Sequence, residues 1–153
     1  MSDVARLGAF LKLGRPHFLV GGFLLFGLGS ALATLQSRAG INWERYVWGQ
    51  AIITAAQWMT HYSNDYFDLD ADRANATPTR WSGGSRVLVS GLVEPRAALG
   101  ASILLGAAAL LAAAVLAARA DSPRCVLPLS LLIIGLSWSY SAPPLRLLRR
   151  GLG

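Results

Sequence analysis

Apolar residues form four long stretches that are separated by shorter polar segments. A membrane-spanning helix needs about 20 mainly apolar residues, a length that the first and third stretches reach. The alternation of apolar and polar residues typical of barrel strands is missing, which leaves helices as the way to satisfy the backbone in lipid. We therefore predict an all-α membrane protein, a single domain over residues 1–153 with four transmembrane helices, at about 16–36, 44–72, 96–119 and 125–141.

Composition supports a membrane location. The chain is 54% hydrophobic and only 14% charged, whereas soluble domains carry about 25% charged residues. The formal net charge is +6, but the basic residues are scattered among the loops and form no stripe or face, so nucleic acid is not an expected partner. The expected surroundings are a lipid bilayer.

The distribution of the basic residues predicts an orientation. With four spans, ten basic residues fall on one side and four on the other, and a positive bias marks the cytoplasmic side. We expect a multi-pass protein of the cell (inner) membrane with a cytoplasmic N-terminus. The first group is Arg6, Lys12, Arg15, Arg73, Arg80, Arg86, Arg96, Arg146, Arg149 and Arg150, and the second is Arg38, Arg45, Arg119 and Arg124.

Polar side chains follow one face of the second predicted helix. At about 100° per residue, seven of them fall within one arc of roughly 100°, and Asp70 lies opposite. Carboxylates near lipid are costly and mark functional sites, and a cation relieves their mutual repulsion. Hard oxygen ligands favour Mg²⁺, which bridges to phosphates, so the face predicts a metal-diphosphate site. The seven are Thr54, Gln57, His61, Asn64, Asp65, Asp68 and Asp72.

Two other interpretations of the acidic stretch were considered. A calcium loop would start at Asp68, but its sixth position is Arg73 instead of Gly and its twelfth is Thr79 instead of Glu. A hydrated helix end without any ligand needs only solvated aspartates. Asn64 and Gln57 reach further toward the membrane interior than solvation explains, so the ligand site is preferred.

A loop from about Arg73 to Arg96 follows the acidic stretch, and its length makes it a candidate lid. Arg80 and Arg86 flank Ser82-Gly83-Gly84-Ser85, which can present backbone N–H groups to an anion while the arginines neutralise its charge. The alternative is a flexible basic loop held by anionic lipid.

The spacing N-D-x-x-D-x-x-x-D, at Asn64, Asp65, Asp68 and Asp72, resembles the first aspartate-rich motif of UbiA-type intramembrane prenyltransferases. Further segments are similar to those that follow the second and fourth helices of that family. They are Ser82-Gly83-Gly84-Ser85-Arg86 and Tyr140-Ser141-Ala142-Pro143-Pro144-Leu145-Arg146.

The resemblance implies a reaction and a role for each residue. It implies Mg²⁺-dependent ionisation of a prenyl diphosphate and attack by an electron-rich aromatic carbon. Asp68 and Asp72 would be the catalytic residues. Metal binding would involve Asn64, Asp68 and Asp72, with Asp65 behind them. The diphosphate would be bound by Arg80, Ser82 and Arg86, and the acceptor cavity would be bordered by His61, Tyr140 and Arg146.

The acceptor and the extent of the enzyme are separate expectations. The Asn-Asp-Tyr, Ser-Gly-Gly-Ser-Arg and Tyr-Ser-Ala-Pro-Pro segments are most similar to 1,4-dihydroxy-2-naphthoate polyprenyltransferases of menaquinone synthesis, and chlorophyll synthase-like and archaeal lipid prenyltransferases share parts of them. The family is a bundle of about nine helices with a second aspartate-rich motif, whereas the last acid here is Asp121. The chain is therefore expected to be an N-terminal half, inactive without the other half. The alternative is a small membrane subunit that binds or transports divalent cations.

Overall fold

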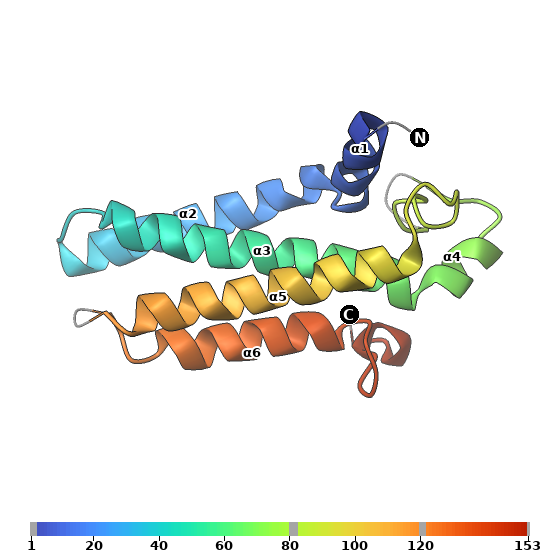
Figure 1. The fold of residues 1–153 in the computed structure, drawn as a ribbon. Coiled ribbons are helices and arrows are strands. Elements are labelled where there is room, and N and C mark those ends of the chain that lie inside the picture. The colour runs from blue at the N-terminus through green and yellow to red at the C-terminus, as the bar shows by residue number, and fades with distance from the viewer. Residues whose placement is uncertain (1–2, 80–82, 120–121, 153) are drawn as a thin grey trace.

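The computed structural model describes residues 3–79, 83–119 and 122–152, and they form a bundle of helices joined by short turns and one longer loop. Four long helices lie side by side along one direction (Figure 1). They are α2 (Pro16–Ser37), α3 (Trp43–Phe67), α5 (Pro95–Ala117) and α6 (Val126–Ser139). Three shorter elements are α1 (Asp3–Leu13), α4 (Leu69–Ala74) and the 3-10 helix η1 (Leu147–Arg150). No strand occurs among the described residues, and the all-α prediction is confirmed.

Helix α3 is the central element, because it packs against α2, α5 and α6 and also touches α1. Its closest neighbour is α5, which turns a face of small buried residues toward it. The Ser102 hydroxyl donates a hydrogen bond of 2.9 Å to the carbonyl of Met59, and a Cβ at Gly106 would lie 2.9 Å from the Met59 sulfur. Small residues let two membrane helices approach closely, which fixes α3 against α5.

Two of the long helices are long and apolar enough to cross a membrane, namely α2 and α5. Helix α3 has 25 residues, about 37 Å at 1.5 Å per residue, but its second half is polar. Helix α6 has 14 residues, about 21 Å, which is less than the usual hydrocarbon core. The structure is thus compatible with a membrane protein, and the four spans remain a prediction.

The sequence prediction differs from the structure mainly in the second helix. The expected helix over 44–72 is interrupted at Asp68, where α3 ends and α4 begins. The backbone of Asp68 has φ −103° and ψ 9°, which lies outside regular helical geometry. Helix α1 was not predicted at all, because its 11 residues are too few for a span and carry charges. The other three helices begin and end within two residues of the predicted bounds.

The two ends of the bundle differ in character. Helix α1, helix α4, the described parts of the 75–94 connection and the C-terminal segment gather at one end, which we call the site end (Figure 1). The α2–α3 connection and the described parts of the α5–α6 connection lie at the other end. There Arg119 and Glu44 form an ion pair with 2.6 Å between nitrogen and oxygen. The basic residues assigned to opposite sides of the membrane therefore lie, where described, at opposite ends of the bundle.

The α3–α5 contact yields a stability prediction. Ala109 is 1% exposed on the packed face of α5, and Ala108 is exposed on the other face. Ala109→Leu forces extra methylenes into a close contact and should destabilise the protein by about 1–3 kcal/mol. Ala108→Leu, which points away from α3, should change stability little. Thermal unfolding in detergent checks both variants, and equal effects would contradict this packing.

The orientation can be tested with the single cysteine of the chain. Cys125 is exposed and lies in the α5–α6 connection, at the end opposite the site end. We expect a membrane-impermeant thiol reagent to label it from outside intact cells. In a Cys125→Ser background, Ala76→Cys should be labelled only after permeabilisation, because residue 76 is exposed at the site end. The opposite labelling pattern would overturn the positive-inside assignment.

Candidate active site

The break at Asp68 keeps the acidic residues on one side of the chain. The Asp68 N–H donates to the Asn64 carbonyl at 2.9 Å, and the Asp72 N–H donates to the Asp68 carbonyl at 2.8 Å. These two bonds continue the i to i+4 pattern across the break, so α4 follows α3 without a reversal. Asn64, Asp68 and Asp72 consequently line one cavity, while the Asp70 side chain is 97% exposed.

This cavity, which we call the polar cavity, has a volume of about 650 Å³. Its walls come from the start of α2, the second half of α3, α4, the loop after it and the C-terminal segment. Two arginines, Arg15 and Arg149, line it together with the acids. The lining residues are Arg15, Phe18, Thr60, His61, Asn64, Asp68, Ala71, Asp72, Gly83, Gly84, Tyr140, Leu148 and Arg149.

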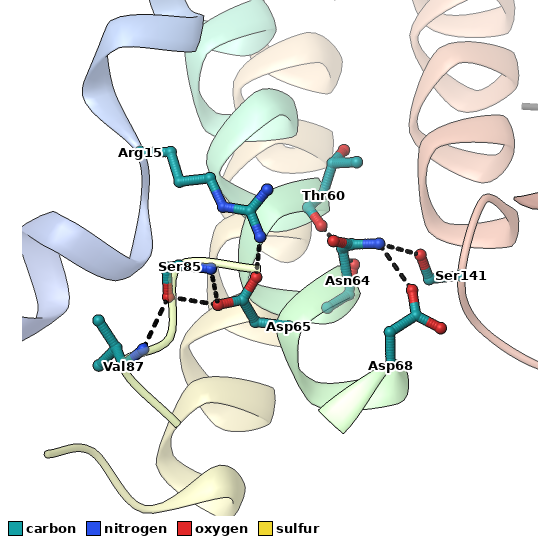
Figure 2. Close-up of polar contacts among 9 residues, drawn as sticks. Arg15, Thr60, Asn64, Asp65, Asp68, Ser85, Val87 and Ser141 are labelled. Carbon is teal, nitrogen blue, oxygen red and sulfur yellow. Dashed lines mark hydrogen bonds and ion pairs between the residues drawn. The ribbon is translucent and has the colours of Figure 1, made fainter. Parts of the chain in front are cut away.

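Asn64 connects α3 to the segment after α6. Its amide donates to the Asp68 carboxylate and to the Ser141 hydroxyl, both at 2.8 Å (Figure 2). Arg149 approaches Asp68 from the same side, with 3.6 Å between Nη2 and Oδ1, and donates to the Phe67 carbonyl at 3.2 Å. The C-terminal segment is thereby held against the end of α3, and it closes that side of the polar cavity.

Asp65 is the one residue of the aspartate-rich motif that does not line the polar cavity. It is 2% exposed. One carboxylate oxygen pairs with the Arg15 guanidinium, and the other accepts from the Ser85 backbone N–H at 3.0 Å and from the Ser85 hydroxyl (Figure 2). Both oxygens therefore have protein partners.

The two acids on the cavity wall are partly removed from water. Asp68 is 9% exposed and Asp72 is half-buried. A carboxylate removed from water needs a cation or hydrogen-bond donors at its oxygens. The Arg149 guanidinium lies 3.6 Å from Asp68. A cation bound in the cavity would stabilise both carboxylates in their ionised form.

The side chains that line the polar cavity suit a metal ion that is also coordinated by a bound ligand better than one coordinated by protein groups alone. Among the residues that the structure describes, no three His, Cys, Asp or Glu side chains come close enough together to hold an ion. Asp68 and Asp72 provide two carboxylates on one wall. Protein-bound Mg²⁺ commonly has one or two carboxylates, several waters and phosphate oxygens of the substrate. The site fits that arrangement.

The remaining predicted residues divide into three groups. His61 and Tyr140 line the polar cavity, and the His61 ring lies 5.7 Å from that of Phe18. Arg86 and Arg146 are not among the lining residues, and Arg86 donates to the Asp72 backbone carbonyl. Arg80 and Ser82 lie outside the described residues.

The polar face of α3 is also less continuous than predicted. Gln57 lines a smaller cavity that shares a wall with the polar cavity. Thr54 lines a groove with Phe23, Trp58 and Leu105 instead. The helical arc thus predicts the site from Gln57 onward and fails one turn earlier.

Arg15 and Arg149 are site residues that sequence reasoning missed. Both were counted only toward the orientation in the membrane. Arg15 lies immediately before the Pro16 that begins α2, and Arg149 lies in η1, after the Pro-Pro turn. The Arg15-Pro16 pair and the basic run from Arg146 to Arg150 were the available signals, but only the folded chain shows which of these arginines reach the cavity.

Comparison with known proteins identifies the family. The profile of the UbiA prenyltransferase family matches residues 21–153, which is most of the chain. The chain therefore belongs to the UbiA prenyltransferase family. Comparisons with curated proteins and with solved structures gave no significant match. Family membership supports a membrane-bound transferase that acts on a prenyl diphosphate and an acceptor.

Proposed function

We propose that the polar cavity binds Mg²⁺ together with a prenyl diphosphate and that the protein transfers the prenyl group to an aromatic acceptor. One observation carries this proposal: two carboxylates, Asp68 and Asp72, line the same cavity as two arginines, Arg15 and Arg149. A diphosphate with its metal needs both kinds of group, because the carboxylates hold the cation and the guanidinium groups bind phosphate oxygens. A bare cation site would not need the arginines.

The proposed reaction follows from the charges. Asp68 and Asp72, with Asn64 beside them, would hold Mg²⁺, which supplies the positive charge that stabilises the leaving diphosphate. Arg15 and Arg149 would bind its oxygens. The allylic C–O bond would then break and release the diphosphate, the carbocation would form a bond with an aromatic carbon of the acceptor, and that carbon would lose its proton to the released diphosphate or to water. Sequestration from bulk water protects the carbocation from hydrolysis.

The isoprenoid tail has a route along α3. The polar cavity shares Phe18, Thr60 and His61 with the smaller cavity at Gln57. That cavity shares Ile53 and Ile133 with a third cavity of about 270 Å³ toward the other end of the bundle. The third cavity is mainly apolar, with Phe26, Ile52, Val126 and Leu129 among its lining residues. The tail would extend along this series of cavities, with its diphosphate at the site end.

The acceptor is proposed to enter beside His61 and Tyr140, both on the wall of the polar cavity. The similarity of the Asn-Asp-Tyr and Tyr-Ser-Ala-Pro-Pro segments favours 1,4-dihydroxy-2-naphthoate, and hence menaquinone synthesis. We further propose that a second aspartate-rich motif completes the metal coordination, since the described residues place carboxylates on only one wall of the cavity.

Charge-neutral substitutions test the metal-diphosphate site. In the full-length protein in membranes, Asp68→Asn or Asp72→Asn should lower Mg²⁺-dependent transfer by at least about 100-fold, since residues that merely support a metal ligand already cost 10–100-fold. Asp70→Asn is the matched control, because Asp70 belongs to the same acidic run but is exposed. Transfer is measured with isotope-labelled prenyl diphosphate and 1,4-dihydroxy-2-naphthoate.

The outcomes separate the possible functions. Equal losses at Asp70 and Asp68 would contradict the assignment of the cavity wall. Transfer to a different aromatic acceptor would keep the site and change only the substrate. Failure of labelled prenyl diphosphate to bind, with Mg²⁺ binding retained, would instead favour a divalent-cation subunit.

A further inference from the structure

Asp65 differs from the other acids of its motif in its surroundings. It is almost completely buried, and the polar cavity ends without touching it. Its two oxygens are occupied separately, one by Arg15 and the other by the backbone N–H and hydroxyl of Ser85. A metal ion in the polar cavity would therefore not contact this carboxylate unless the surrounding side chains moved.

The two partners of Asp65 belong to different walls of the polar cavity. Arg15 lines the cavity itself, at the junction between α1 and α2. Ser85 directly follows Gly83 and Gly84, which also line the cavity and have φ of 85° and 71°. Gly84 packs so tightly against the Asp72 carboxylate that a Cβ at this position would overlap it. A single carboxylate on α3 therefore fixes two segments that lie far apart in the sequence.

The buried charge of Arg15 requires an anion beside it. Arg15 is largely buried, with 16% of its side chain exposed, and its Nε has no hydrogen-bond partner among the described residues. Removing one member of a buried ion pair leaves an uncompensated charge, which is much more costly than the pair itself. Without Asp65, the Arg15 side chain would have to move toward water or toward another anion. Its place on the cavity wall depends on Asp65.

We propose that Asp65 is a positioning residue, which orients Arg15 and the Gly83–Ser85 segment as two walls of an anion site and does not itself bind the metal. The anion class is a diphosphate, and this part of the proposal rests on the proposed function. The structural part, that one carboxylate holds both walls, does not depend on any activity.

Amide hydrogen exchange in lipid nanodiscs tests the structural part. Asp65→Asn keeps the size of the side chain and an acceptor oxygen but removes the charge that Arg15 needs. Asp65→Ala removes both interactions. Exchange at the amides of Ser85 and Val87 should increase at least about tenfold in Asp65→Ala and remain unchanged in Asp70→Ala. Val87 is informative because its N–H donates to the Ser85 hydroxyl at 3.2 Å. Unchanged exchange in Asp65→Ala would overturn the proposal.

Kinetics of the full-length protein in membranes tests the role in anion binding. Asp65→Asn should raise KM for the prenyl diphosphate at least about tenfold and leave the Mg²⁺ concentration for half-maximal rate unchanged, whereas Asp68→Asn should raise the Mg²⁺ requirement. Arg15→Gln should likewise raise KM for the prenyl diphosphate and leave the Mg²⁺ requirement unchanged, because Arg15 is one of the two walls that Asp65 holds. An increased Mg²⁺ requirement in Asp65→Asn would show that Asp65 is a metal ligand and overturn the proposal.

A milder variant serves as a control in case the Asp65 variants do not fold. The exchange experiment and the kinetic experiment can also fail independently of each other. Should the Asp65 variants not accumulate in membranes, Ser85→Ala removes the hydroxyl bond to Asp65 and keeps both the backbone N–H bond and the Arg15–Asp65 pair. It should increase exchange at the amide of residue 85, whose bond to Asp65 is then the remaining loop contact, and unchanged exchange at that amide would count against the proposal. If the unmodified protein transfers no prenyl group, the proposed function fails, while the exchange experiment still decides whether Asp65 holds the two walls.

Discussion

Charge compensation at the end of α3 is the constraint on which the site end of the bundle depends. A buried carboxylate is stable only with a cation or with hydrogen-bond donors at its oxygens. Asp65 obtains both from Arg15 and Ser85. Asp68 obtains an amide from Asn64 and a more distant guanidinium from Arg149. Asp65 thereby binds the α1–α2 junction and the loop at Ser85, and Asp68 binds the C-terminal segment. These segments form the walls of the polar cavity.

The acids are compensated to different degrees, and this difference separates support from chemistry. Both oxygens of Asp65 have protein partners and its side chain does not reach the cavity. Asp68 and Asp72 line the cavity, so a cation that entered it would meet these two carboxylates first. Within the motif, Asp65 is proposed to position the walls of the site, and Asp68 and Asp72 are proposed to bind the metal.

The sequence predicted the long helices well because their signals are local. Apolar length, Pro16, Pro95 and the Pro143-Pro144 pair mark helix positions without reference to the rest of the chain. The break at Asp68 has no such mark, since no Gly or Pro occurs there and the i to i+4 bonds continue across it. The positions of Asn64, Asp68 and Asp72 on one side were predictable from helical periodicity, because the break rotates the chain little.

The sequence alone could not predict the contacts between segments that lie far apart in the chain. Nothing local shows that Asp65 meets Arg15, 50 positions away, or that Asn64 meets Ser141, 77 positions away. The same holds for Thr54, which the helical arc placed with the acids but which faces a groove beside α2 and α5. Packing of neighbouring helices, and not the arc alone, decides which part of a helix face reaches a cavity.

Three arginines at the site end have a strained backbone conformation. Arg15, Arg86 and Arg146 have positive φ of 44°, 63° and 45°, a conformation that costs roughly 1–2 kcal/mol for residues other than glycine. Each lies at a junction of the site end: before α2, after the Gly83-Gly84 pair and before η1. Arg15 is held there by Asp65, and Arg86 by the Asp72 carbonyl. Glycine would relieve the backbone but would leave no guanidinium to meet these oxygens, so the ion pair with Asp65 accounts for arginine at position 15 and the hydrogen bond to the Asp72 carbonyl accounts for it at position 86.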